Sequence, residues 1–147
     1  MPAFLFPTGL SRFHDLALLA LRLFLGAFLI YGVWDNIASA ARMAEFVDFL
    51  AKLNCPLPDL AARVSVWVQF VTGVLLIGGM FTRWAGLLLA ANFVVAVALI
   101  APTGASFRDL YPPTILVFIG LLLATTGAGR LSADAGLEAR WSRPARP

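Results

Sequence analysis

The sequence predicts an all-α integral membrane protein: a four-transmembrane-helix bundle with an interfacial amphipathic helix between helices 1 and 2. Of the 147 residues, 61% are hydrophobic and 13% are charged, whereas soluble domains carry about 25% charged residues. Four apolar runs are each long enough to cross the hydrocarbon core of a bilayer. Because only a helix satisfies its own backbone groups in lipid, each run is expected to be a helix.

The first spanning helix is expected at residues 16–38, and it contains an arginine. Residues 16–33 have the sequence LALLALRLFLGAFLIYGV, in which Arg22 is the only charged residue. A charge at that depth is costly unless it snorkels to the interface or finds partners. A cleaved signal peptide is the alternative, with Ala38-Ser39-Ala40 as the cleavage site, but the apolar run is longer than a usual signal core.

The other three spanning helices are expected at residues 60–81, 84–101 and 110–127. The second and third runs are linked only by Thr82-Arg83, which predicts an antiparallel hairpin. Pro112 and Pro113 are interpreted as the start of the fourth helix, because proline is tolerated in a first helical turn. Residues 1–147 therefore form a single membrane domain, which ends in a cytoplasmic tail at residues 128–147.

Residues 41–53, between the first two spans, have the pattern of an amphipathic helix. Their sequence is ARMAEFVDFLAKL, with most charges on one face and an apolar face made of Met43, Phe46, Phe49, Leu50 and Leu53. Such a helix lies in the membrane interface with its apolar face buried. Asn54-Cys55-Pro56 is expected to end it.

The basic residues predict the orientation in the membrane. One side holds six of them: Arg12, Arg83, Arg130, Arg140, Arg143 and Arg146. The other side holds four: Arg42, Lys52, Arg63 and Arg108. Because the cytoplasmic side carries the excess of Lys and Arg, both termini are expected in the cytoplasm of a multi-pass protein of the cell inner (plasma) membrane.

Four polar residues at membrane depth form the predicted binding site: Arg22, Gln69, Thr72 and Asn92. At about 1.5 Å per residue, Arg22, Thr72 and Asn92 lie at similar depths in the membrane, and Gln69 lies roughly 5 Å further in. We therefore expect Arg22 to point into the bundle and reach Asn92 or Thr72. The alternatives are ordinary hydrogen bonds between helices and an Arg22 that snorkels toward lipid phosphates.

The sequence offers no other site chemistry. The single Cys55 excludes a disulfide or a Cys-x-x-Cys pair within this chain, and with His14 alone it cannot form a metal site. No metal is therefore expected, and Cys55 is interpreted as an ordinary small residue. No basic helix or Gly-rich phosphate loop indicates nucleic acid or nucleotide binding.

Several segments, in the same order along the chain, resemble the DoxX family of small four-helix membrane proteins. They are LRLFLGAFLIYGVWD in the first helix, GVLLIGGMFTRWAGLLLA across the hairpin, and TTGAGRLSADAGL after the fourth helix. The resemblance covers residues 19–137. It implies a four-helix membrane bundle, and some members of the family are associated with thiosulfate:quinone oxidoreduction.

The chain departs from the family pattern at charged positions. Arg22 matches, but Asp35 replaces a common Lys, and Gln69 and Leu110 replace glutamates. A glutamate beside Arg22 could shuttle protons, whereas Gln69 can form hydrogen bonds but cannot ionise. These differences argue against proton-coupled chemistry within this chain, and no enzymatic activity is assigned.

Two functions are compatible with the sequence. The first is an accessory subunit of a quinone-linked redox system, for example one acting on sulfur or thiols, that binds a quinone in an inner-leaflet pocket and works with a soluble or membrane redox partner. The second is a non-catalytic membrane scaffold or a lipid- or small-molecule-binding protein. A transporter is a third, weaker alternative, since four helices would have to oligomerise to form a pathway. A homo-oligomer is compatible with each.

The predicted topology can be tested with cysteines introduced singly at Ser106 and Ser142 of a Cys55→Ser variant. An impermeant thiol reagent added outside intact cells should label position 106 and leave position 142 unlabelled. Labelling of 142 but not 106 would reverse the orientation.

Overall fold

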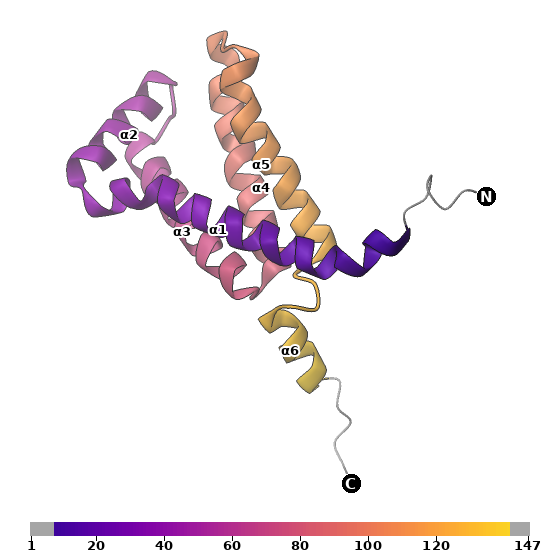
Figure 1. Ribbon diagram of the computed structural model, residues 1–147. Coiled ribbons are helices and arrows are strands. Elements are labelled where there is room, and N and C mark those ends of the chain that lie inside the picture. Colours follow the sequence, from indigo (N-terminus) through magenta and orange to yellow (C-terminus); the bar gives the residue numbers. More distant parts are fainter. Residues whose placement is uncertain (1–7, 142–147) are drawn as a thin grey trace.

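The computed structural model describes residues 8–141, and every regular element in that range is a helix (Figure 1). The elements are a short 3-10 helix Thr8–Phe13, α1 (His14–Ala38), α2 (Ala40–Lys52), α3 (Pro58–Gly78), α4 (Thr82–Ile100), a 3-10 turn Ala101–Thr103, α5 (Phe107–Thr126) and α6 (Ala133–Trp141). Within the described part of the chain, α1, α3, α4 and α5 are long and apolar enough to cross a membrane. The predicted fold class is thereby confirmed.

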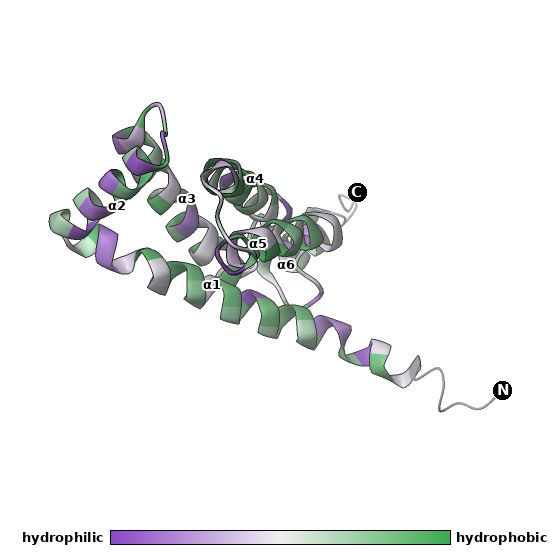
Figure 2. Cartoon of the chain, turned by 90° about the horizontal axis from the view of Figure 1, so that it is seen from above, coloured by the Kyte–Doolittle hydropathy of each residue, from purple (hydrophilic) through white to green (hydrophobic). Residues whose placement is uncertain are grey.

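The four long helices form two crossed pairs. Helix α1 packs along α3, and α4 packs along α5. Figure 1 shows the α4–α5 pair rising across the α1–α3 pair, and from above α4 and α5 are seen nearly end-on while α1 lies across the view (Figure 2). One apolar core joins all four helices, made of Leu18, Leu25, Leu29, Leu76, Ala85, Leu89, Leu116 and Leu123.

Each helix pair is held together at a contact between two glycines. A Cβ atom on Gly26 of α1 would lie 2.6 Å from the carbonyl oxygen of Gly73 in α3. A Cβ atom on Gly86 of α4 would lie 2.5 Å from the carbonyl oxygen of Gly120 in α5. Both distances are shorter than van der Waals contact, so only glycine permits these backbones to approach so closely. Close approach at small residues is a main source of packing energy between helices in lipid.

The turn between α3 and α4 differs from the prediction. Helix α3 ends at Gly78 instead of residue 81, and Gly79 follows with a left-handed backbone, φ 62°. Phe81 is also left-handed, φ 49°, and α4 begins directly after it. The predicted link Thr82-Arg83 is thus the first turn of α4, and a glycine C-terminal cap places the bend three residues earlier.

Helix α5 begins three residues before its predicted start at 110. The hydroxyl and backbone N–H of Ser106 both donate to the Asp109 carboxylate, at 2.7 and 3.0 Å, in a capping box. This cap starts the helix at Phe107 and leaves Pro112 and Pro113 inside it. The Ser-x-x-Asp spacing is a helix-start signal, and it outweighs the proline pair that was interpreted as the start.

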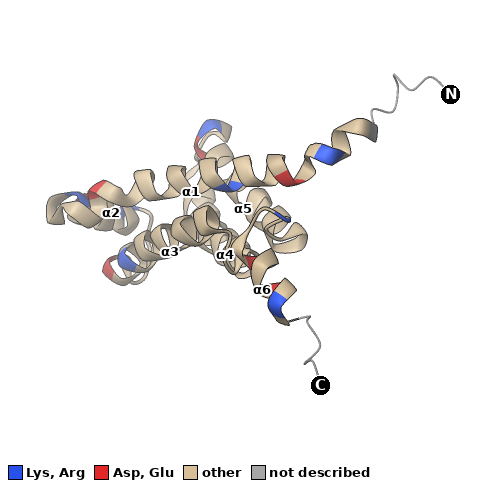
Figure 3. Ribbon diagram, turned by 60° about the horizontal axis from the view of Figure 1, so that its bottom comes forward, with Lys and Arg blue, Asp and Glu red and all other residues tan. Residues whose placement is uncertain are grey.

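The outer surface of the spans is apolar, as contact with lipid requires. Phe24, Val94 and Phe118 are among many large apolar side chains left exposed on the long helices. Apart from Arg22 within α1, the charged residues of the described chain lie near the ends of the long helices, in loops, or on α2 and α6 (Figure 3). With four candidate spans, the chain is a multi-pass membrane protein in contact with the lipid bilayer.

The glycine contacts generate a stability prediction. Gly26→Ala should lower the unfolding free energy by about 1–3 kcal/mol, because the methyl group forces α1 away from α3. Gly32→Ala is the matched control on the same helix, since nothing lies within 4 Å of a Cβ atom there. It should be neutral or stabilising by up to about 1 kcal/mol. Thermal unfolding of both variants in one detergent makes the comparison, and equal melting temperatures would contradict it.

Candidate functional site

Arg22 is buried and joins three segments of the chain. Its residue is 1% exposed. One terminal nitrogen, Nη1, donates to the Leu76 carbonyl of α3 at 3.4 Å, and the other, Nη2, donates to the Leu131 carbonyl after α5 at 2.5 Å. The negative charge of Asp134 also acts favourably on the guanidinium. Arg22 therefore points into the protein, as expected, but its partners are main-chain carbonyls, and neither Thr72 nor Asn92 is among its described partners.

Helix geometry explains why Arg22 reaches these partners. Side chains on a helix tilt toward its N-terminus, and the N-terminus of α1 lies beside the segment that follows α5, where Asp15 accepts a hydrogen bond from the Arg130 N–H at 2.9 Å. The long side chain thus extends away from the middle of the helices. Gly79 makes room for it, because a Cβ atom there would collide with the Arg22 guanidinium.

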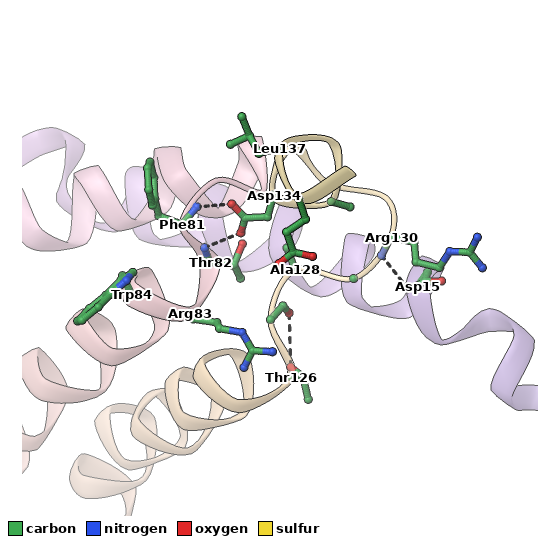
Figure 4. Close-up of a pocket in the computed structure, with 14 residues that line it drawn as sticks. Asp15, Phe81, Thr82, Arg83, Trp84, Thr126, Ala128, Arg130, Asp134 and Leu137 are labelled. Carbon is green, nitrogen blue, oxygen red and sulfur yellow. Dashed lines mark hydrogen bonds between the residues drawn. The ribbon is translucent and has the colours of Figure 1, made fainter. Parts of the chain in front are cut away.

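The predicted tail, residues 128–147, is described as far as residue 141, and this described part folds back against the helices. Both oxygens of Asp134 accept hydrogen bonds at the start of α4, from Phe81 N–H at 2.7 Å and Thr82 N–H at 2.9 Å (Figure 4). The Asp134 N–H donates to the Gly79 carbonyl at 2.9 Å. A carboxylate at a helix N-terminus satisfies free N–H groups and complements the helix dipole. Asp134 is therefore the N-terminal cap of α4, supplied from another part of the chain.

A cavity of about 430 Å³ lies between this segment and the ends of α4 and α5. Arg83 lines it and donates through Nη1 to the carbonyls of Ala124 and Thr125, at 3.0 and 2.6 Å. A cation in that position satisfies the free carbonyls at the end of α5. Asp15, Arg83 and Asp134 thus hold chain segments together, and this end of the molecule is a structural junction.

A second cavity, of about 390 Å³, lies between α2, α3 and α4 and is almost wholly apolar. Its polar lining residues are Ser65 of α3 and Asn92 of α4. Asn92 is half-buried, and its amide makes no hydrogen bond to the described residues. The apolar lining comes from α2 (Phe46, Phe49, Leu50, Leu53), α3 (Ala61, Val64, Val68) and α4 (Leu88, Ala91, Val95, Ala96, Leu99, Ile100).

The structure does not bring the four predicted site residues together in one place. Asn92 lines the apolar cavity. Gln69 does not line it, but its Nε2 donates at 3.1 Å to the hydroxyl of Ser65, which does. Thr72 is fully buried, with no partner for its hydroxyl among the described residues, and Arg22 belongs to the junction at the other end.

The apolar cavity lies in the half of the molecule away from that junction. Along α4 it extends from Leu88, in the first half of the helix, to Ile100 at the C-terminal end. The junction instead surrounds the N-terminal end of α4. With both termini in the cytoplasm, the cavity would open to the outer leaflet, whereas the sequence suggested an inner-leaflet pocket near Arg22.

Sequence reasoning missed Ser65 as a site residue and the amphipathic helix α2 as a wall. The spacing of Ser65 and Gln69 is a recognisable signal, since residues four apart are neighbours on a helix surface. The apolar face of α2 was expected to lie in lipid, but it packs toward α3 and covers the cavity. No pattern within residues 41–53 indicates whether the apolar face of this helix contacts lipid or another helix.

Charged groups near α2 form local ion pairs. Arg42 lies 2.7 Å from Glu45 and 3.7 Å from Asp35, and Arg63 lies 3.1 Å from Asp59. The hydrogen bond to Glu45, together with its charge, raises the pKa of Arg42. These pairs are exposed and contribute little stability.

The cap at α4 gives a prediction for the junction. Asp134→Ala should lower the unfolding free energy by about 0.5–2 kcal/mol, the usual value of an N-terminal cap. Asp134→Asn should retain most of that stability, since asparagine also caps helices well. Amide hydrogen exchange at Phe81 and Thr82 is the local measurement. Unchanged exchange in Asp134→Ala would show that the cap does not form.

The comparisons with known proteins agree with this architecture. The DoxX family model matches residues 17–102, more than half of the chain. The match includes Arg22, the α3–α4 turn and Asn92, and it ends before α5 and the docked segment. No curated protein and no solved structure shows significant similarity to the chain. With its four apolar helices and a match of that extent, the chain belongs to the DoxX family.

Proposed function

We propose that this DoxX protein binds a quinone, or a similar carbonyl-bearing amphiphile, in the cavity between α2, α3 and α4. The observation that carries the proposal is an apolar cavity of about 390 Å³ whose lining includes Ser65 and Asn92 as hydrogen-bonding groups. Small-molecule sites are typically apolar cavities with a few polar groups that orient the ligand. The volume suits a head group and the first part of an apolar chain.

The state of Asn92 supports a ligand with its own polar group. The amide lies near the middle of a membrane-spanning helix and has no partner among the described side chains or carbonyls. An unsatisfied amide in an apolar environment costs about 1–3 kcal/mol or more. A carbonyl oxygen can accept from the Asn92 N–H groups, and a ligand hydroxyl can donate to its oxygen.

The proposed role is that of an accessory subunit that holds the ligand for a soluble or membrane redox partner. Electrons must come from that partner, because no side chain in the cavity can carry them. Gln69 and Asn92 cannot ionise, so protons must also reach the ligand by another route. We propose the inner membrane as the location, with both termini cytoplasmic, on the basis of the Lys and Arg distribution.

The second candidate function is a non-catalytic lipid- or small-molecule-binding protein or scaffold. The feature that favours it is the absence of any acidic or basic residue from the cavity lining. A lipid acyl chain would occupy the apolar part of the cavity and leave Asn92 unpaired. The two functions therefore differ in whether the occupant has a polar head that reaches Asn92.

The test is the quinone content of purified protein, measured by mass spectrometry of extracted ligands. Asn92→Leu should reduce bound quinone by about tenfold, the factor that one or two hydrogen bonds in an apolar site supply. Thr114→Val is the matched control, because Thr114 lies in α5 outside the cavity and donates to the Leu110 carbonyl of its own helix. It should retain wild-type quinone.

Arg22→Lys distinguishes this site from the one that the sequence suggested. Lysine retains the charge but loses the planar fork that joins two carbonyls, so folded Arg22→Lys protein should retain its quinone. Loss of quinone in Arg22→Lys with retention in Asn92→Leu would place the ligand near Arg22. Lipid but no quinone in wild-type protein would favour the second function.

A further inference from the structure

The hydrogen bond between Gln69 and Ser65 involves one of the two polar side chains that line the cavity. Gln69 Nε2 donates to Ser65 Oγ at 3.1 Å, one helical turn away on α3. Ser65 lines the cavity, and Gln69 does not. Gln69 therefore influences a ligand only through the Ser65 hydroxyl.

A serine hydroxyl has one proton to donate and two lone pairs that accept. In this pair the Gln69 N–H occupies one of the lone pairs, so the proton of Ser65 must point elsewhere. Ser65 donates no hydrogen bond to the described residues, including the carbonyl of Ala61 one turn earlier on its helix. The free donor of Ser65 is thus available to the cavity, whose other walls are apolar except at Asn92.

We propose that Gln69 is a positioning residue that holds Ser65 as a hydrogen-bond donor, so that the cavity selects a carbonyl head group over the corresponding hydroxyl. This inference rests on the proposed function. A carbonyl oxygen accepts the Ser65 proton and adds no proton of its own. A hydroxyl in the same place can accept the Ser65 proton or donate to the remaining Ser65 lone pair. In either case one of the two hydroxyl protons is left without an acceptor, because the walls around Ser65 are apolar, and this weakens binding.

Asn92 does not make this selection. Its amide presents both a donor and an acceptor, so it can pair with either head group. The discrimination therefore depends on Ser65, and through Ser65 on Gln69. For a quinone-like ligand the site would favour the oxidised form over the quinol.

The experiment compares a decyl-substituted benzoquinone with its quinol, the latter kept reduced under argon, by equilibrium binding to protein in nanodiscs. Wild-type protein should bind the quinone about tenfold more tightly, the factor that one unsatisfied hydrogen bond represents. Gln69→Leu should bring the ratio close to one, because the Ser65 hydroxyl can then turn to the carbonyl of Ala61. Ser65→Ala should do the same, and the double variant should add no further change.

A purely structural role for Gln69 predicts a different result. In that case Gln69→Leu would weaken both probes equally and leave their ratio unchanged, and the proposal would be wrong. A wild-type preference for the quinol would also overturn it, since Ser65 would then be donating to Gln69. Failure of both probes to bind wild-type protein would reject the proposed function itself, together with this inference.

Discussion

The buried Arg22 guanidinium is the interaction on which the architecture depends. It sits where α1, α3 and the segment after α5 converge, and its two terminal nitrogens serve two carbonyls from different segments. Burying a charged group is costly unless its surroundings satisfy it; here the two carbonyls satisfy the terminal nitrogens, while Nε has no partner among the described residues. Each of the three segments must therefore be in place for the others to be stable there. Asp134, which acts electrostatically on Arg22, also caps α4 and brings the fourth segment into the same junction.

The junction and the glycine contacts together explain why the protein has a cavity. Gly26 with Gly73 and Gly86 with Gly120 bring the two helices of each pair into close contact, while the two pairs are joined at the junction end and cross (Figure 1). Because the crossed helix pairs are joined near one end, they diverge toward the other end, and their side chains cannot fill the space between them there. Helix α2 covers part of that space, which leaves the cavity beside Ser65 and Asn92.

The sequence predicted the class of fold and the depth of its polar residues, since both depend on local patterns. The lengths of the apolar runs indicated the membrane spans. The family was indicated by three segments: the first helix with Arg22, the α3–α4 hairpin, and the segment after the fourth helix. The depth of Arg22 was a sound reason to expect a buried side chain, and it is buried. Helix ends were predicted less well. The local caps at Gly79 and Ser106 were not recognised, and the cap of α4 comes from Asp134, a residue 52 positions away from Thr82.

The candidate site was predicted only in part, for a reason of geometry. Equal depth places Arg22 and Asn92 in the same layer of the membrane only if the helices run parallel and the side chains extend sideways. Here the helix pairs cross, and Arg22 extends along its helix toward Leu131. No pattern of residue types along one chain specifies the angle between two helix pairs, so the separation of Arg22 from the cavity at Asn92 was not predictable.

The remote cap on α4 has a consequence for biosynthesis. The start of α4 emerges from the ribosome 52 residues before Asp134, a delay of roughly 3 to 10 s at about 5–20 residues per second. During that interval the α3–α4 hairpin has no carboxylate at its turn, and Arg22 has no Leu131 carbonyl. A chain interrupted before residue 131 would keep all four spans and yet expose an unpaired arginine and an uncapped helix. Those are features by which membrane quality control could distinguish an unfinished molecule from a finished one.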